Sequence, residues 1–364
     1  MYSVLKNSPR CLAALRVNGQ KRWQSPGTSP SSSVRAKEGG ARGKDDQPSK
    51  GSDKTEHYHV RLMTSPSELS LLLEWAVAEG WNPGVYDAES YFRQDPTGFY
   101  LAELDSVPIG GLGSVKCGED LGSMCLYVVK PPFRGKGYGY RMWKEVIKKT
   151  GNRNMFLESV AAQQSNYEKS GFVPGSWQTT RFRGVGRDDV HNVGYAGNHV
   201  TLVSVDEVDF EDLCAFDQRV FGAPRPAFLK SWINQPGMVG LVAIENLKLI
   251  NIDDHNQNRE STIVGYGCIR LCYEGYQSAT FSRKIGPIFA ESSTVGSQLF
   301  TALVATVPLG IPFYIDVINT NEGAMRMVEG FGVESMFQTT RMFTKGNWGV
   351  QTSLIYGQTT LEMG

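Results

Sequence analysis

One stretch of sequence decides the fold of this chain: Leu126-Tyr127-Val128-Val129-Lys130-Pro131-Pro132-Phe133-Arg134-Gly135-Lys136-Gly137-Tyr138-Gly139. Its apolar first half predicts a buried strand, and its glycine-rich second half predicts a turn that leads directly into a helix. The glycines leave backbone N–H groups uncovered at the N-terminus of that helix, where the positive end of the helix dipole also lies. Such a turn suits a diphosphate, and Arg134 and Lys136 add positive charge. A tight turn whose glycines only supply positive φ would produce the same pattern.

The turn does not match two other phosphate-binding motifs. It lacks the closing Gly-Lys-Ser/Thr of a P-loop, and it does not contain Gly-x-Gly-x-x-Gly in the order that dinucleotide-binding folds use. None of the five histidines lies near the turn in sequence. No nucleophile elbow accompanies them, so a serine hydrolase is disfavoured.

Strand and helix patterns surround this junction. We expect strands at 59–63, 98–103, 108–116, 124–129 and 155–160, and helices at 66–80, 87–93, 138–150 and 163–170. Strands that run together before the main helix and then alternate with helices indicate an α/β fold with a mixed sheet, that is, an α+β mixed sheet.

The chain repeats itself at long range. Gly171-Phe172 is followed by Gln178-Thr179-Thr180-Arg181-Phe182, and Gly330-Phe331 is followed by Gln338-Thr339-Thr340-Arg341-Met342. This near-identity at matching places predicts duplication of a whole domain. We expect domains at 58–182 and 201–345, a linker at 183–200, and a C-terminal strand or tail at 346–364.

Composition excludes several classes of function. Lys+Arg and Asp+Glu both number 37, so no global field attracts nucleic acid or an anionic membrane. No apolar run reaches the ~20 residues of a membrane-spanning helix. The six cysteines show no metal-binding spacing, which predicts reduced thiols and no metal.

The N-terminus differs in kind from the rest of the chain. Residues 1–37 carry Lys and Arg but no Asp or Glu, which is the composition of a mitochondrial transit peptide. We expect the transit peptide at 1–25, a disordered linker at 26–57, and a location in the mitochondrial matrix. A disordered basic tail on a cytoplasmic protein is the alternative.

A second motif lies about thirty residues beyond the turn, as a helix and one strand require. It reads Ser165-Asn166-Tyr167-Glu168-Lys169-Ser170-Gly171-Phe172. Together, Arg134-x-x-Gly137-x-Gly139 and this segment resemble the acetyl-CoA motif and the Tyr-Glu-Lys-x-Gly-Phe segment of the GNAT superfamily of N-acetyltransferases. The resemblance covers most of residues 58–345 and is to the tandem type, in which two GNAT-type folds follow one another.

The resemblance implies a role for each residue of the site, with acetyl-CoA as co-substrate. Backbone groups of Leu126, Tyr127 and Val128 would pair with the pantetheine arm, and one N–H there would stabilise the oxyanion. Tyr167 would protonate the departing thiolate; a half-buried core tyrosine is the alternative. The residues that would hold the pyrophosphate are Arg134, Gly135, Lys136, Gly137, Tyr138 and Gly139.

The attacking amine must lose a proton before it can react, because its pKa is about 10. Glu158, on the strand expected to face the cofactor strand, is our candidate for the base, with Glu103 as runner-up. Both residues could equally be solvated charges at strand ends.

The second copy has lost the features that would bind a cofactor. Val328 stands where Tyr167 stands in the first copy, and the turn that follows its central strand carries Glu291 but no Arg and no paired glycines. We expect a degenerate domain that supplies a wall of the acceptor pocket, with Arg225, Trp232 and Arg270 as lining. Alternatively, it only covers apolar surface of the first domain.

The resulting functional hypothesis is an N-acetyltransferase that transfers an acetyl or acyl group from acetyl-CoA to the amine of a small molecule or amino acid, by direct attack in a ternary complex. One alternative is a protein or peptide N-acetyltransferase. Another is a non-catalytic acyl-CoA-binding regulatory protein. Neither nucleic acid nor a membrane is expected as a partner.

Overall fold

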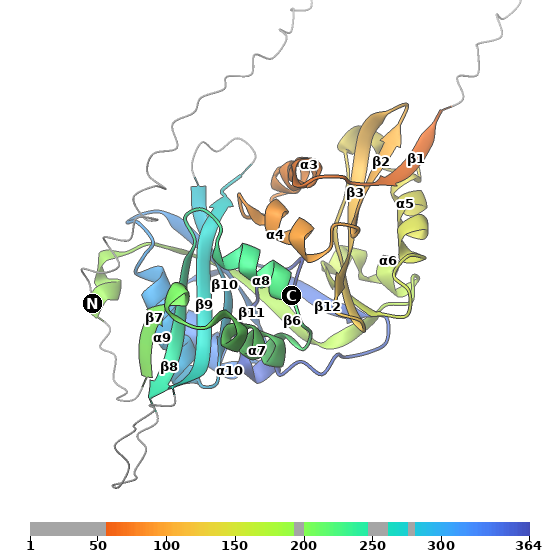
Figure 1. The fold of residues 1–364 in the computed structure, drawn as a ribbon. Helices are drawn as coiled ribbons and strands as arrows, with labels where there is room; N and C mark the ends of the chain where they lie inside the picture. Colours follow the sequence, from red (N-terminus) through yellow and green to blue (C-terminus); the bar gives the residue numbers. More distant parts are fainter. Residues whose placement is uncertain (1–55, 193–199, 247–260, 276–280) are drawn as a thin grey trace, which may run out of the picture. The chain divides into compact units, whose positions relative to one another are not determined.

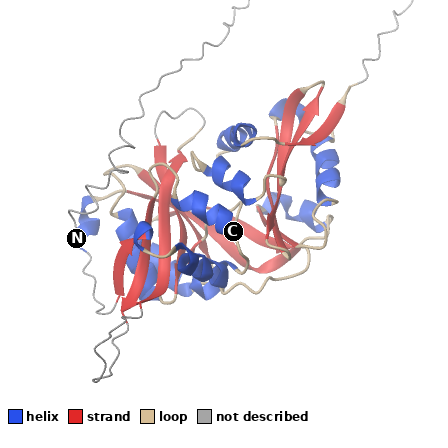
Figure 2. Cartoon of the chain, in the orientation of Figure 1, coloured by secondary structure: helices blue, strands red, loops and turns tan. Residues whose placement is uncertain are grey.

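The computed structural model describes residues 56–192, 200–246, 261–275 and 281–364 (Figures 1 and 2). The predicted transit peptide and most of the predicted linker 26–57 lie outside these residues, as does part of the linker 183–200. All elements belong to the compact unit Tyr58–Gly364.

The strands and helices predicted between residues 59 and 170 are present in the predicted order, with bounds that differ by a few residues. In the first half they are β1 (Tyr58–Leu62), α3 (Pro66–Ala78), α4 (Asp87–Gln94), β2 (Phe99–Leu104), β3 (Val107–Cys117), β4 (Leu121–Val129), η2 (Pro131–Phe133), α5 (Tyr138–Ile147), β5 (Asn154–Ser159), η3 (Ala161–Gln163), α6 (Gln164–Glu168) and β6 (Val173–Val185). In the second half they are η4 (Asp188–Asn192), β7 (Val200–Ser204), η5 (Val205–Glu207), α7 (Phe210–Phe221), α8 (Pro226–Ile233), β8 (Val239–Asn246), β9 (Ser261–Tyr273), β10 (Phe281–Ala290), α9 (Ser293–Val304), β11 (Pro312–Ile318), α10 (Glu322–Phe331), β12 (Glu334–Phe343), η6 (Thr352–Leu354) and β13 (Ile355–Gly357).

The strands form one mixed sheet, which confirms the predicted fold class. Twelve of them follow the order β1-β2-β3-β4-β5-β12-β6-β11-β10-β9-β8-β7, and β13 pairs with β10. The pairs β4–β5 and β10–β11 are parallel, and the other pairs are antiparallel. The two parallel pairs occupy matching places in the two copies of the domain.

The two copies exchange their last strands in the middle of this sheet. Strand β12 of the second copy lies between β5 and β6 of the first, and β6 lies between β12 and β11. The repeated segments pair with one another, Gln338 opposite Thr180 and Thr339 opposite Thr179. The predicted domain bounds at 182 and 345 therefore divide the chain but not the sheet.

Helices cover both faces of the first half of the sheet (Figure 1). Helix α3 begins at the N-cap Ser65, whose side chain accepts from Glu68 N–H, and it buries a stripe that includes Leu69 and Leu72. Helix α5 packs on the opposite face through Met142 and Val146. The space beside β4 is therefore bounded by helices on both sides.

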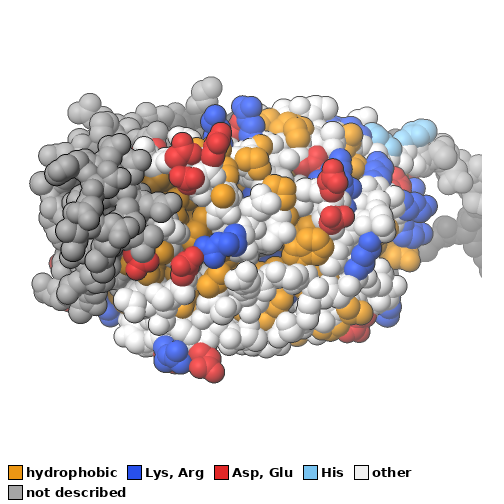
Figure 3. Space-filling model, turned by 60° about the horizontal axis from the view of Figure 1, so that its bottom comes forward, with side chains coloured by type: hydrophobic (Ala, Val, Ile, Leu, Met, Phe, Trp, Pro, Cys, Tyr) orange, Lys and Arg blue, Asp and Glu red, His pale blue; other side chains and the backbone are white. Residues whose placement is uncertain are grey.

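No helix of the described residues is both long and apolar enough to cross a membrane. Acidic and basic side chains are interspersed on the face drawn in Figure 3. That face therefore presents no extended field of a single sign.

Candidate active site

Strands β4 and β5 separate beside the predicted cofactor strand. They pair only at Leu121–Asn154, Gly122–Met155 and Ser123–Phe156. On its other edge, β5 pairs with β12 from Phe156 to Ser159. The remainder of β4, from Met124 to Val129, is therefore not paired with β5, and we call this opening the β4–β5 split.

A bulge bends β4 inside the split. Leu126 has φ 50°, a left-handed conformation that is uncommon for a residue with a branched side chain. The register between β3 and β4 shifts at the same place, since Gly113 pairs with Cys125 and Gly111 with Val128. Bulges re-aim the strand next to functional sites. Here the bulge falls on Leu126 and Tyr127, two of the residues predicted to bind pantetheine.

The predicted turn between β4 and α5 forms a nest of backbone N–H groups. Gly135 and Gly137 have φ of 73° and 84°, and Gly137 is the N-cap of α5 without a side-chain cap. Within the described residues, the N–H groups of Gly135, Lys136, Gly137 and Gly139 have no hydrogen-bond acceptor. Open N–H groups at a helix N-terminus can bind a diphosphate. We refer to residues 135–139 as the nest.

Arg134 and Lys136 flank the nest in different ways. Arg134 Nε donates to the carbonyl oxygen of Val129 at 2.7 Å, and its guanidinium forms an ion pair with Glu79 at the end of α3. The Lys136 ammonium lies 5.9 Å from the centre of the Phe133 ring. Glu79 therefore offsets the charge of Arg134, a partner that sequence spacing did not indicate.

Three aromatic side chains connect the split to the second motif. Trp143 of α5 lies 5.5 Å from Tyr127 of β4 and 5.4 Å from Tyr167 of α6, measured between ring centres. Burial raises the pKa of Tyr167 to about 12, so its hydroxyl stays protonated and can act as a proton donor. The structure thus brings Tyr127 and Tyr167 together through Trp143, which the sequence analysis did not single out.

Packing against β4 also requires a glycine at position 139. A Cβ atom at this position would lie 2.8 Å from the Tyr127 hydroxyl and 3.0 Å from a methyl group of Val129. Close approach of the Tyr127 ring to α5 therefore requires a residue without a side chain, in addition to any contact with a ligand.

The carboxylate of Glu158, the predicted base, accepts hydrogen bonds from four side chains. Its carboxylate accepts from Arg341 Nε at 2.7 Å, from the Thr339 hydroxyl at 2.5 Å, and from Thr179 and Gln358. The runner-up Glu103 forms ion pairs with Arg61 and His59 on the outer strand pair β1–β2.

The pairing of Glu158 has a counterpart in the second copy. Glu158 on β5 pairs with Arg341 on β12, and Asp316 on β11 pairs with Arg181 on β6 in the same register relation. Arg181 donates to both Asp316 oxygens, at 2.6 and 2.8 Å. The second copy keeps this ion pair although it has no open cofactor site. We therefore assign Glu158 a structural role, in which its ion pair with Arg341 holds the exchanged strand β12 against β5.

The second copy also splits between its parallel strands, but its own chain fills the opening. Strands β10 and β11 pair at Arg283–Phe313, Lys284–Tyr314 and Ile285–Ile315. Strand β13 then pairs with β10, and Gln358 N–H donates to the carbonyl oxygen of Asp316 at 2.8 Å. A strand therefore lies where pantetheine would lie in the first copy.

The turn that follows β10 is closed as well. Ser292 caps α9 by accepting from Val295 N–H, whereas Gly137 at the start of α5 offers no such cap. Glu291 pairs with Arg219 at 2.6 Å. Val328, which lies four residues before the left-handed Gly332 as Tyr167 lies four residues before the left-handed Gly171, is fully buried. The second copy thus has neither an uncovered nest nor the tyrosine.

The three residues predicted to line an acceptor pocket are buried between the copies. Arg270 of β9 donates to both carboxylate oxygens of Asp87 in α4, at 2.8 and 2.9 Å, and lies over the Trp232 ring. Arg225 forms a similar pair with Asp217. Only the Arg270 pair joins the second copy to α4, because Asp217 and Arg225 both belong to the second copy. All three side chains are buried and do not line open space.

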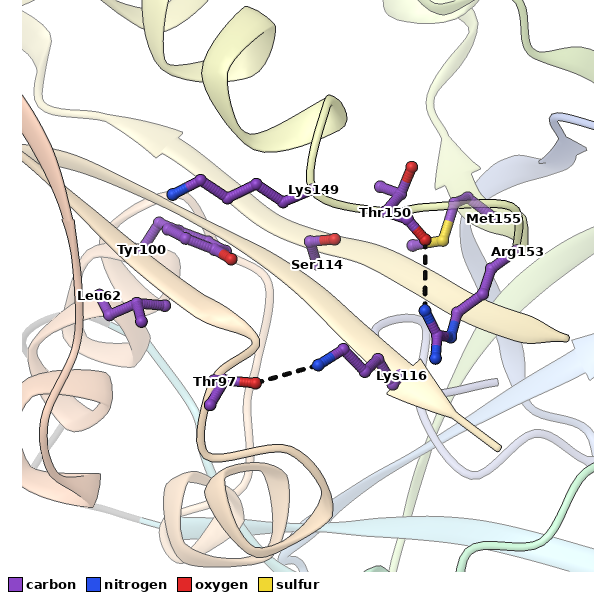
Figure 4. Close-up of a pocket in the computed structure, with 9 residues that line it drawn as sticks. All are labelled: Leu62, Thr97, Tyr100, Ser114, Lys116, Lys149, Thr150, Arg153 and Met155. Atoms are coloured by element: carbon purple, nitrogen blue, oxygen red, sulfur yellow. Dashed lines mark hydrogen bonds between the residues drawn. The ribbon is translucent and has the colours of Figure 1, made fainter. Parts of the chain in front are cut away.

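A cavity of about 250 Å³ lies away from the split, beyond the C-terminal end of α5 (Figure 4). Its charged lining residues are Lys116, Lys149 and Arg153. Lys116 donates to Thr97, Lys149 lies over Tyr100, and Arg153 donates to the Thr150 carbonyl oxygen, a common way to satisfy a helix C-terminus. The nest lies at the other end of α5, so we do not place the reaction in this cavity. Among the described residues, no cluster of His, Cys, Asp or Glu is arranged to hold a metal ion.

Two family models match the chain. The acetyltransferase (GNAT) family model matches residues 66–172, and an acetyltransferase (GNAT) domain model matches residues 213–357. The holothin acyltransferase of Pseudoalteromonas sp. (strain SANK 73390) is 30% identical over 300 residues, which cover 82% of this chain and 92% of that protein.

Solved structures share the whole fold. A protein of Pyrococcus horikoshii described as an acetyltransferase superposes with a TM-score of 0.64 at 17% identity, over 84% of this chain and 96% of that one. A tandem GNAT protein from the clavulanic acid biosynthesis pathway superposes with a TM-score of 0.55 at 12% identity, over 79% of this chain and 98% of that one.

Fold and site together define an acyl-CoA-dependent acyltransferase built from two copies of one domain. The chain belongs to the GNAT family of acetyltransferases, in its tandem form.

Proposed function

We propose that this chain transfers an acetyl group from acetyl-CoA to the amine of a small molecule, with the first copy as the catalytic domain. The observation that carries the proposal is the open nest at residues 135–139 beside the β4–β5 split, with Trp143 packed between Tyr127 and Tyr167. The second copy has the same split, but β13 fills it.

The site's own groups suggest how the transfer proceeds. Unpaired backbone of β4 binds the pantetheine arm as an added strand, and an N–H near the bulge at Leu126 stabilises the oxyanion. The nest binds the diphosphate. Tyr167 gives its proton to the thiolate as the carbon–sulfur bond breaks, which suits a hydroxyl whose pKa is about 12. Glu158 holds β5 to β12.

A small-molecule acceptor is supported by the relative, whose name states that it acylates holothin. We therefore prefer it to the alternative of a protein or peptide acceptor. The mitochondrial location remains a prediction from residues 1–37.

The experiment is an acceptor screen that detects the free thiol released from acetyl-CoA with panels of amines, amino acids and peptides. Arg134→Glu should raise KM for acetyl-CoA sharply, because it places a second carboxylate beside Glu79 at the nest. Lys149→Glu, in the distant cavity of Figure 4, is the matched charge-reversal control and should leave that KM unchanged. Acetyl-CoA that stabilises the chain against heating without releasing thiol with any amine would instead indicate a non-catalytic binding protein.

A further inference from the structure

The chain does not end at β13 but continues into the space between the two copies. Thr359, Thr360 and Met363 are fully buried, and Glu362 is 7% exposed. The Ser123 hydroxyl donates to the carbonyl oxygen of Glu362 at 2.5 Å. Ser123 is the last residue of β4 that pairs with β5, so this segment lies at the closed end of the β4–β5 split.

The side chain of Glu362 lies between α4 and β4. The Tyr91 hydroxyl of α4 lies 3.3 Å from Glu362 Oε2, and its single proton is shared with Asp87 Oδ2 and Thr360 Oγ1 at the same distance. On β4, the charge of Glu362 is the main electrostatic influence on the buried thiol of Cys125, whose pKa is raised first by burial and then by this carboxylate. Cys125 directly precedes Leu126, the residue of the bulge. The carboxylate therefore lies on the α4 side of β4, near Cys125.

Glu362 differs from the other buried carboxylates of the described residues in its partners. Arginine side chains donate to the carboxylates of Asp87, Asp217, Asp316, Glu103 and Glu158. Asp95 accepts from two backbone N–H groups. The Glu362 carboxylate has a single neutral donor, the Tyr91 hydroxyl, at a long distance. Burial of a carboxylate with so little compensation is costly unless a cationic partner binds to it.

Other charged groups around Glu362 already have partners. Arg181 of β6 and Lys284 of β10 act on it electrostatically, but both form ion pairs with Asp316. The charge of Glu362 also acts on Tyr91 of α4 and Cys125 of β4, and the Asp87 carboxylate, which Arg270 neutralises, shares the Tyr91 hydroxyl with it. The arrangement leaves Glu362 as the acid group available to an incoming ammonium ion.

We propose that Glu362 binds the acceptor's ammonium group and removes its proton, and is therefore the catalytic base of the first copy. This inference rests on the proposed function and narrows the substrate class to basic primary amines. Tyr91, which orients the carboxylate, is a positioning residue.

The ammonium group gives one proton to Glu362, and the neutral nitrogen attacks the thioester carbonyl carbon, so that a carbon–nitrogen bond forms. The carbon–sulfur bond then breaks, and Tyr167 gives its proton to the thiolate. The nitrogen loses its second proton to the tyrosinate, and Glu362 releases its proton to solvent. The products are the amide, the CoA thiol and one proton.

The test compares two kinds of acceptor in the full chain. Primary alkylamines, with a pKa near ~10, are protonated at neutral pH and need a base, whereas aniline and its ring-substituted derivatives are already neutral. Glu362→Gln, which keeps the shape and can still accept from Tyr91, should lower kcat/KM for alkylamines by about 10²–10⁴-fold. For anilines the loss should be under about tenfold, because no proton has to be removed before attack.

Two further variants separate chemistry from folding. Glu362→Asp should recover part of the alkylamine activity, and Glu362→Gln should keep wild-type affinity for acetyl-CoA. Glu158→Gln, which breaks the ion pair with Arg341, should lower the thermal midpoint and reduce turnover of both amine classes equally.

An equal loss for both amine classes in Glu362→Gln, or no loss, would overturn the assignment while leaving the proposed function intact. Turnover of anilines alone by the wild-type chain would also overturn it. Absence of turnover with every acceptor would overturn the proposed function itself, and this inference with it.

Discussion

The ion pair between Asp87 and Arg270 allows a sharp test of how the two copies are joined. It links α4 of the first copy to β9 of the second, and neither side chain is more than 1% exposed. The change Arg270→Met removes the charge and keeps an apolar side chain of similar length over Trp232. Asp87 then keeps only neutral donors, namely Gly84 N–H at 2.8 Å, the Gln235 amide at 3.4 Å, and the Tyr91 hydroxyl that it shares with Glu362.

The expected cost follows from leaving a buried carboxylate without its cation. Removal of one partner of a buried pair costs about 3–5 kcal/mol, and the remaining donors place this case near the lower figure. Unfolding entropy of about 2.1 cal/mol/K per residue, over roughly 300 residues, converts ~3 kcal/mol into a fall in Tm of about 5 °C.

Denaturant and thermal unfolding of four proteins measure this cost: wild type, Arg270→Met, Asp87→Asn, and the double variant. The double variant should be more stable than Arg270→Met alone, because it no longer buries an unpaired carboxylate. Burial alone would raise the pKa of Asp87, but Arg270 outweighs it and lowers that pKa. The contribution of the ion pair to the free energy of unfolding is therefore fully present above about pH 3.9, the pKa of an aspartate in the unfolded chain. It is lost as the pH falls through the lower pKa that Asp87 has in the folded protein.

A cost below about 1 kcal/mol for Arg270→Met, the level of an exposed pair, would refute this reasoning. A double variant no more stable than Arg270→Met would refute it too. A gap between wild type and Arg270→Met that widens below about pH 4 would contradict the sign of the pKa shift.

Three further outcomes are expected. Tyr167→Phe should lower kcat by about 10²–10⁴-fold at unchanged acetyl-CoA affinity, and equal kcat values for the variant and the wild type would exclude Tyr167 as the proton donor. Because burial raises the pKa of Tyr167 to about 12, loss of its proton should not reduce wild-type turnover up to about pH 10. Gly139→Val brings a Cβ to 2.8 Å from the Tyr127 hydroxyl, which should lower the free energy of unfolding by about 1–3 kcal/mol and raise KM for acetyl-CoA. An unchanged thermal midpoint would contradict the close packing of Tyr127 against α5. The fragment 58–190 lacks β12, which pairs with β5 and β6, and should not unfold cooperatively; a sharp thermal transition would show that strand exchange is dispensable.

Local sequence determined most of the individual elements and the nest. Apolar spacing and glycine positions act within one or two turns of chain, so they predict a strand, a turn and a helix at Leu126–Gly139 directly. The duplication was visible because Gln178–Arg181 and Gln338–Arg341 kept nearly the same residues. Even the loss of the second cofactor site could be predicted, since Glu291 and Val328 replace residues whose chemistry is local.

Only the tertiary structure decided which distant groups meet. Periodicity says which face of a strand is buried but not which strand lies beside it, so β12 between β5 and β6 could not be predicted. That exchange pairs Glu158 with Arg341. Long-range pairing also places β13 beside β10, in the opening between the parallel strands of the second copy. It brings Glu362 to Ser123 of β4, which lies more than 230 residues away along the chain. The candidate cofactor site is thus encoded locally, because a diphosphate needs only one turn and one helix end. The surroundings of Glu362, where we propose that the acceptor binds, are assembled from remote segments by folding.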